Sequence, residues 1–439
     1  MKLEDFMNAS PVNFFAVETI KKCLTEAGYK EWKAGEPCPE VKSGDKLFST
    51  KNGSAIFAFH IGKKSLAEGG MRIISAHSDS PCFRVKPNAE IKCEGGLVKL
   101  NTELYGGAIM STWMDRPLSL AGRVVLAGES MTEPEVRLMR IERPILTIPN
   151  LAIHFNRQVN DGVALSKQKD MLPVLTVENG KVKGENGNLE AGNGSILKGL
   201  VAEELGVDAG EILDFDLYLY DTTPAQRVGL YGELIQSGRL DDLSMAHAGM
   251  EALLADGETP EVTKCLAIFD NEETGSQTKQ GAGSPFFASL VQRLVARQSE
   301  TCASPFEDFA MCVEHSFMVS ADNAHAWHPN YNEKYDPTNH PVMGGGPVIK
   351  YNASQKYLSD AVGASVFMQA CKKVGAPYQT FVNHSDVAGG STLGNILSSS
   401  LPVKGVDMGN PIWGMHSVRE TASIQDHENC IKVFTAFYE

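Results

Sequence analysis

The sequence predicts an α/β fold in which a β-rich segment is inserted into a domain of alternating strands and helices. Three observations predict it. Strand-like and helix-like segments alternate after residue 239, short β-like segments follow one another between about residues 90 and 231, and 439 residues exceed the length of one ordinary domain. We expect residues 1–89 and 233–439 to form the α/β domain and residues 90–232 to form the inserted one.

The composition limits the function classes. The chain has 54 acidic and 40 basic residues, a formal net charge of −14, which disfavours nucleic acid and anionic membranes as partners because both require a basic patch. Its nine cysteines are scattered, and the N-terminus has no basic segment followed by an apolar one. These features predict reduced thiols in a cytoplasmic protein without a membrane span.

The elements follow in chain order. Ser10 as N-cap, with Pro11 in the first turn, predicts a helix that Gly28 ends. Apolar segments at 55–60 and 71–76, bounded by glycine-containing turns, predict strands. In the β-rich segment we expect strands over 96–100, 123–126, 136–148, 172–177 and 215–220, and one helix over 196–205.

The C-terminal part returns to alternation. Helices are expected over 243–254, 286–297 and 355–374, and strands over 264–269, 312–319, 378–382 and 403–407. Strands that alternate with helices predict a mainly parallel sheet covered by helices on both faces, to which the strands at 55–60 and 71–76 also belong.

Histidine and acidic side chains follow strand ends or helix starts at five places. They are His77 with Asp79, Asp241 with Asp242, Glu272 with Glu273, Asp322 with His325 and His328, and His416. Because ligands bind at the carboxyl edge of parallel sheets, we expect these places to meet in one crevice.

The residue types suit a paired metal site. His77, Asp241, Glu273, Asp322 and His416 supply two imidazoles and three carboxylates, a set that zinc, cobalt or manganese accepts. A paired site needs one carboxylate that bridges, with one histidine and one acid on each ion. Glu272 is then left over, and a spare carboxylate beside a metal can act as the general base of a hydrolysis.

Six segments resemble the M18 family of aminopeptidases, which aspartyl aminopeptidase typifies. They are AHSDSPCFRVKP at 76–87, IPNLAIH at 148–154, GRLDD at 238–242, DNEETG at 270–275, ADNAH at 321–325 and MHSVRE at 415–420. The resemblance runs in the family's order from residue 10 to the C-terminus. It implies a zinc-exopeptidase-like three-layer α/β catalytic domain with an inserted β-rich dimerisation domain.

The resemblance also implies roles for the metal residues. His77 and Asp322 would hold one zinc ion, Glu273 and His416 the second, and Asp241 would bridge the two.

Further roles follow from the same resemblance. Asp79 would orient His77, and Glu272 would be the general base. His154, from the β-rich domain, would reach a neighbouring subunit's site and bind the substrate carbonyl within a tetrahedral homododecamer built from dimers.

The substrates implied are peptides with acidic N-terminal residues. Lys350 matches a position that holds the acidic side chain, whereas Asn383 and His384 stand where the family has an arginine. We therefore expect Lys350 and His384 to bind substrate, and His325 to line the site because it is close to Asp322 in the sequence.

Two alternatives remain open from the sequence. One is a two-metal deacylase or amidohydrolase on a related scaffold, which would act on N-acylated substrates. The other is a non-catalytic assembly protein, which would not need the metal residues that this chain contains.

Overall fold

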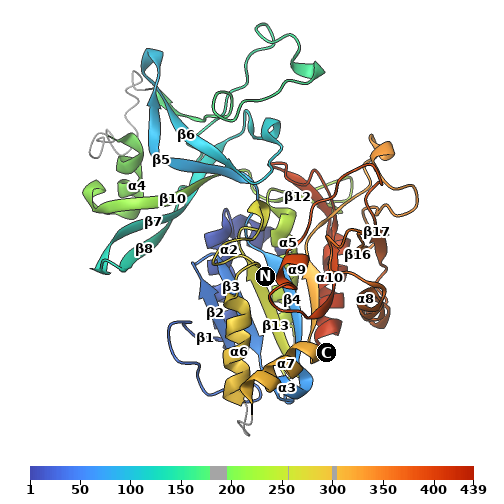
Figure 1. The fold of residues 1–439 in the computed structure, drawn as a ribbon. Coiled ribbons are helices and arrows are strands. Elements are labelled where there is room, and N and C mark those ends of the chain that lie inside the picture. The colour runs from blue at the N-terminus through green and yellow to red at the C-terminus, as the bar shows by residue number, and fades with distance from the viewer. Residues whose placement is uncertain (178–194, 256, 299–303) are drawn as a thin grey trace. The chain divides into compact units, whose positions relative to one another are not determined.

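The structure is a computed structural model that describes residues 1–177, 195–255, 257–298 and 304–439. The chain forms two compact units (Figure 1). The first contains Met1–Ser80, Ala225–Met415 and Arg419–Glu439, and the second contains Pro81–Pro224 and His416–Val418. The boundaries expected near residues 90 and 232 thus fall at residues 80 and 224 in the structure.

A nine-stranded sheet is the centre of the first unit. In spatial order its strands are β1 (Lys30–Glu31), β2 (Lys46–Lys51), β3 (Ala55–His60), β13 (Thr263–Phe269), β4 (Met71–His77), β14 (Phe317–Ala321), β18 (Lys404–Gly409), β16 (Val348–Lys350) and β17 (Gln379–Phe381). The four central strands β13, β4, β14 and β18 are parallel to one another, whereas β3 runs antiparallel to β13 and β16 runs antiparallel to β18.

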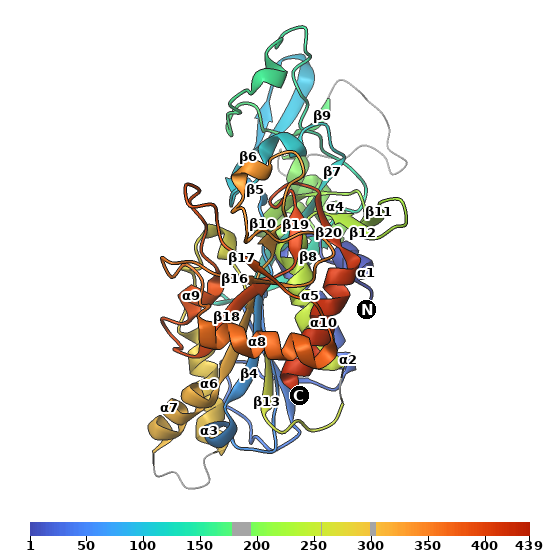
Figure 2. The same ribbon diagram turned by 90° about the vertical axis from the view of Figure 1, so that its right-hand side faces the viewer.

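Helices cover both faces of this sheet. One face packs against α1 (Leu3–Ala9), α2 (Asn13–Glu26), α5 (Leu240–Leu254), α8 (Ala361–Val374) and α10 (Ile424–Tyr438), of which α8 and α10 lie nearest the viewer in Figure 2. The other packs against α3 (Leu66–Gly69), α6 (Phe286–Gln298), α7 (Pro305–His315) and α9 (Leu393–Leu397). Successive side chains of β13 alternate between the two cores, as expected for a strand buried on both sides. Within the described parts of the chain, every helix falls short of the length and apolarity that crossing a bilayer requires.

A second, five-stranded sheet belongs to the same unit. Its order is β11 (Gln226–Val228), β12 (Leu234–Ser237), β20 (Glu420–Ser423), β19 (Pro411–Trp413) and β15 (Ala324–His325). Two residues separate β12 from α5, which begins at Leu240, and one residue separates Asp322 from β15. The small sheet therefore positions two of the five predicted site segments, the one with Asp241 and the one with Asp322.

The second unit is built on six antiparallel strands. Their order is β8 (Glu133–Arg140), β7 (Leu118–Ser130), β10 (Ile212–Asp221), β5 (Cys82–Lys92), β6 (Leu97–Tyr105) and β9 (Val174–Val177), and α4 (Ile196–Leu205) packs its apolar side chains into the same core. Val124 and Leu126 of β7 and Phe215 and Leu217 of β10 are buried and alternate with more exposed residues, which gives this part of the sheet one buried face.

Four expected elements are wrong in detail, and the first is the strand expected over 136–148, which ends at Arg140 as β8. Ser10 does not begin a helix: α1 ends at Ala9, because the residue before a proline disfavours the helical conformation, and α2 begins only at Asn13. The strand expected over 312–319 begins later than predicted, as β14 at Phe317. Cys312 lies instead in α7, whose start is capped by the Ser304 side chain. The helix expected from residue 355 begins after its N-cap Asp360.

Candidate metal centre

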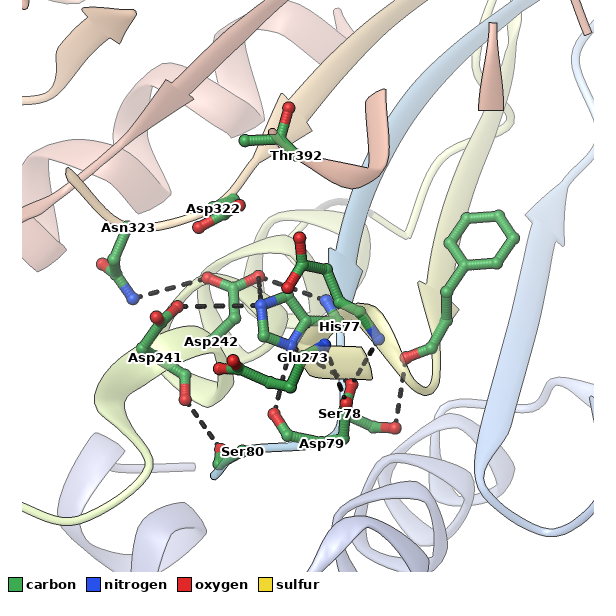
Figure 3. A network of polar contacts seen from close by, with 12 residues as sticks. His77, Ser78, Asp79, Ser80, Asp241, Asp242, Glu273, Asp322, Asn323 and Thr392 are labelled. Atoms are coloured by element: carbon green, nitrogen blue, oxygen red, sulfur yellow. Dashed lines mark hydrogen bonds and ion pairs between the residues drawn. The ribbon is translucent and has the colours of Figure 1, made fainter. Parts of the chain in front are cut away.

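Predicted site residues of the first unit gather at the carboxyl ends of neighbouring strands. His77 ends β4, Asp322 follows β14, and the turn that carries Glu272 and Glu273 follows β13. Because β4 pairs in parallel with both β13 and β14, these three strand ends share one edge of the sheet. Asp241, from the first turn of α5, joins them, and Figure 3 shows it beside His77.

The imidazole of His77 is oriented by contacts on both nitrogens. With its proton on Nδ1, the ring donates to the main-chain oxygen of Asp79 at 3.0 Å, and the Asp79 carboxylate lies 3.4 Å from the same nitrogen. Nε2 lies 3.7 Å from Oδ1 of Asp241 and 4.0 Å from Oδ2 of Asp242. This is the arrangement of a metal-binding histidine, with one nitrogen held by the protein and the other facing acids.

Asp79 also holds the turn after β13. Its carboxylate oxygens accept the backbone N–H groups of Glu272 at 3.1 Å and of Glu273 at 3.2 Å. Asn271, just before, adopts a left-handed conformation with φ 60°, and its side-chain oxygen accepts from Thr278 and Gln280. One buried carboxylate therefore links the end of β4 to the two glutamates after β13.

Two groups of side chains in the first unit have the spacing of metal ligands. One consists of His77, Asp241, Asp242 and Asp322, all buried, and the other of His77, Glu272 and Glu273; within each, the ligand atoms lie within 4.8 Å of one another. Ligands of zinc lie about 2.1 Å from the ion, so two of them on one tetrahedral ion are about 3.4 Å apart. The 3.7 Å between His77 and Asp241 is close to this value. The donor set fits zinc.

Burial and mutual repulsion disfavour ionisation of these acids. Burial raises the pKa of Glu272 to about 9, an effect that His77 opposes and that Asp322 and Glu273 increase. Burial likewise raises the pKa of Asp322 and, much further, that of Asp242, each with additional repulsion from Asp241. Acids that resist ionisation together are stabilised in their charged form by a bound cation.

The cationic side chains beside these acids are His77 and Lys350. Burial alone would lower the pKa of His77, but the carboxylates of Asp242, Asp79 and Glu272 raise it well above its usual range. Lys350 is buried, and its ammonium donates to the main-chain oxygens of Asp322 at 2.7 Å and Asn323 at 3.3 Å. Lys350 therefore supports the segment that follows β14.

The other predicted residues do not belong to these two groups of donors. The ring of His325 is exposed on β15, with its centre 6.0 Å from that of Phe381, and Nδ1 of His384 accepts the N–H of Asp386. His154 and His416 belong to the second unit, where His154 is exposed and Nδ1 of His416 lies 3.1 Å from the oxygen of Gly107.

Two residues beside the predicted ligands, Asp242 and Asn323, had no role in the interpretation of the sequence. Asp242 contributes a carboxylate to the first cluster and accepts the N–H of His77 at 3.1 Å, while its peptide bond to Asp241 is cis. The Asn323 side chain donates to Leu240, Asp242 and Ser244. Asp242 follows Asp241 and Asn323 follows Asp322 in the sequence, and this adjacency to predicted ligands is the signal that could have identified them.

Comparison with known proteins identifies the family. Residues 6–438 match the family described as Aminopeptidase I zinc metalloprotease (M18). The chain belongs to the M18 family. A probable M18 family aminopeptidase 2 of Clostridium novyi (strain NT) is 46% identical over 437 residues, which cover 100% of this chain and 98% of that relative. This M18 protein is therefore a metalloaminopeptidase, a hydrolase of peptide bonds, as the sequence predicted.

Solved structures share the fold of this chain. A chain in the cryo-EM structure of the Ape4 and Nbr1 complex is 34% identical with a TM-score of 0.92, over 99% of this chain and 84% of that one. Chaetomium thermophilum mApe1 is 30% identical with a TM-score of 0.86, over 99% and 96%. The predicted α/β fold is confirmed, and the family's description as zinc metalloproteases agrees with the donor set above.

Proposed function

We propose that this M18 aminopeptidase binds two zinc ions and releases N-terminal residues from peptides, with a preference for aspartate and glutamate. The observation that supports it best is the packing of acidic side chains around His77, where the pKa values of Asp242, Glu272 and Asp322 are raised. Cations would relieve this repulsion, and cobalt or manganese could replace zinc at such ligands.

The ligand assignment follows the two groups of donors. His77, Asp241 and Asp322 would hold one ion, with Asp242 beside them. Glu273 would hold the second ion together with Asp241 as the shared ligand. His416 would complete the second set, an assignment that rests on the MHSVRE segment of the sequence.

Glu272 is the residue that we propose to move the proton. It would accept a proton from the attacking water and deliver it to the leaving amine. Asp79 holds its backbone N–H, so the carboxylate is presented from a fixed turn. Zinc, when bound, supplies Lewis acidity toward the peptide carbonyl and toward the attacking water. Cations close to Glu272 would also lower its pKa from about 9 toward neutrality, where a general base is most effective.

The acidic preference rests on Lys350. Although burial alone lowers its pKa, the Asp322 carboxylate 3.6 Å away raises it, so the side chain stays charged. An ammonium has three N–H groups, and two of them are used by Asp322 and Asn323. We propose that the third binds a substrate carboxylate, with His325 and His384 as further contacts.

Self-association is the partner that we propose besides peptides. His154 lies on an exposed loop of the second unit between Ile153 and Phe155, which are 52% and 82% exposed, and Leu151 is 58% exposed. Apolar side chains gathered on a surface are typical of interaction sites. A second copy would cover this loop in a tetrahedral homododecamer built from dimers, and His154 would bind the substrate carbonyl in that neighbour.

A substrate panel tests the catalytic proposal. Aspartyl, glutamyl, alanyl and leucyl anilides, each with its N-acetylated counterpart, are compared by kcat/KM in the presence of zinc, cobalt or manganese. We expect hydrolysis to require the metal and the α-amine and to be fastest for the acidic residues. Preferential hydrolysis of the N-acetylated compounds would instead indicate a deacylase, and turnover that resists chelators would contradict the metal mechanism.

The variant Lys350→Gln separates the specificity claim from the catalytic one. If Lys350 binds the substrate, kcat/KM falls more for the aspartyl anilide than for the alanyl anilide. An equal fall for both would mean that Lys350 only supports Asp322.

A further inference from the structure

Glu420 is a buried acid outside the predicted ligand set, and it contacts the backbone of Asp241. It is the first residue of β20, and its side chain is almost completely enclosed, with 1% exposure. Its Oε2 accepts the backbone N–H of Asp241 at 3.0 Å. The two residues are 179 positions apart, so the fold brings them together.

The strand pairing explains how Glu420 reaches Asp241. Glu420 lies opposite Ser237, the last residue of β12, in the antiparallel β12–β20 pair. The chain leaves β12 at Ser237, turns through Arg239 in a left-handed conformation with φ 63°, and enters α5 at Leu240. The Glu420 carboxylate thus spans this turn from its strand to the first turn of the helix.

Asp241 requires such partners because its own backbone is not helical. Its φ and ψ are −82° and 108°, and N–H groups in the first turn of a helix have no acceptor within the helix. Side chains from separate segments satisfy the local backbone: Glu420 accepts the N–H of Asp241, Ser80 donates to its oxygen at 2.7 Å, and Asn323 donates to the oxygen of Leu240 at 2.8 Å. The main chain of Asp241 is therefore held from both sides.

The informative feature of Glu420 is that an acidic side chain occupies this buried position. A glutamine could accept the same N–H, whereas a carboxylate adds a negative charge to a buried region that already holds Asp241, Asp242 and Asp322. Burying a further anion there costs free energy unless cations are close. A charged acceptor also makes the stronger hydrogen bond, which fixes the peptide more tightly.

We propose that Glu420 is a positioning residue of the metal centre: it fixes the Asp241 main chain so that the carboxylate can be shared by two cations. The inference rests on the proposed role of Asp241 as the bridging ligand. Glu420 acts only through Asp241 and does not touch the substrate. Residues that orient metal ligands in this way typically change metal affinity about 10- to 100-fold when they are replaced.

The test compares Glu420→Gln and Glu420→Ala with a matched buried acid. Asp426 lies six residues further on, is fully buried, and accepts the N–H groups of Gly344 at 2.7 Å and Gly346 at 2.8 Å. Asp426→Asn therefore replaces a comparable buried acid whose described hydrogen bonds go to residues other than the predicted ligands. Zinc affinity is measured by competition with a chromophoric chelator, thermal midpoints by circular dichroism, and ligand geometry by the absorption spectrum of the cobalt-loaded protein.

We expect about tenfold weaker zinc binding for Glu420→Gln, a larger loss for Glu420→Ala, and an altered cobalt spectrum for both. Asp426→Asn should lower the thermal midpoint and leave zinc affinity and the spectrum unchanged. Wild-type zinc affinity and spectrum in Glu420→Gln would overturn the inference, and so would loss of folding in that variant, since Glu420 would then serve folding. If the wild-type chain itself binds no zinc, the proposed function fails instead.

Discussion

Two clusters of acidic residues, one in each unit of this chain, differ in the partners of their carboxylates. In the second unit, Asp216 of β10 lies against the guanidinium groups of both Arg84 and Arg123, and Asp221 pairs with Arg116. In the first unit, acids that follow β13 and β14 and acids of α5 converge on His77, and Lys350 is the other cation beside them. Acids paired with arginines stabilise a fold, whereas acids gathered with few cations indicate a site that binds one.

The largest expected effect is on turnover. Replacing Glu272 by glutamine removes the proposed general base and should lower kcat about 100- to 10,000-fold. Zinc affinity should change much less, because Glu273 and the residues around His77 are intact. Turnover close to that of the wild-type enzyme, measured with zinc content confirmed in the same preparation, would rule out Glu272 as the base.

The next effect concerns pH and zinc affinity. The pKa of Glu272 is raised to about 9 and that of His77 is raised well above its usual range, so both groups hold protons near neutrality that a bound cation must displace. Affinity should therefore rise with pH, by about tenfold per pH unit for each proton released. Chelator competition between pH 6 and 8.5 measures this slope. A flat or falling slope would mean that the acids around His77 do not titrate against the metal.

A smaller effect is expected on the stability of the zinc-free protein. The pKa of Glu272 rises from 4.5 to about 9 on folding, so its favourable contribution is complete below pH 4.5 and is lost as the pH rises toward 9. Glu272→Gln removes this loss and should raise the thermal midpoint of the zinc-free protein more at pH 8 than at pH 5. The same gain at both pH values would contradict the raised pKa.

The smallest effect is expected in the second unit. Asp216→Asn breaks two ion pairs with partly exposed arginines, which should lower the free energy of unfolding by about 1 kcal/mol, as for other such pairs. Zinc affinity and kcat should be unchanged. Chemical denaturation and chelator competition on the same samples check both expectations. A fall in zinc affinity would contradict the claim that Asp216 serves only the stability of the second unit.

The sequence predicted the sheet and the convergence of its strand ends, because both follow from local patterns. A strand buried on both faces, such as β13, reads as a continuous apolar segment, and acids after such strands meet at one edge. The break between α1 and α2 was missed, although Pro11 provided a signal at Ser10.

The contacts that hold the site could not be predicted in the same way. Glu420 reaches Asp241 through a strand pair, and Asn323 reaches Leu240 from 83 residues away. Such hydrogen bonds depend on the complete fold and leave no periodic pattern in the sequence. For the same reason, the sequence assigned Lys350 to the substrate and did not reveal its contacts with the main chain after β14.

Zinc stoichiometry tests the central claim most directly. Equilibrium dialysis of the purified chain against buffered zinc, with metal content measured by mass spectrometry, is compared between the wild type and Asp241→Asn. Because Asp241 is proposed to be shared, we expect about two tightly bound zinc ions per wild-type chain and loss of tight binding at both positions in the variant. Two ions retained by Asp241→Asn, or none bound by the wild type, would contradict a shared-carboxylate zinc centre at the edge of the sheet.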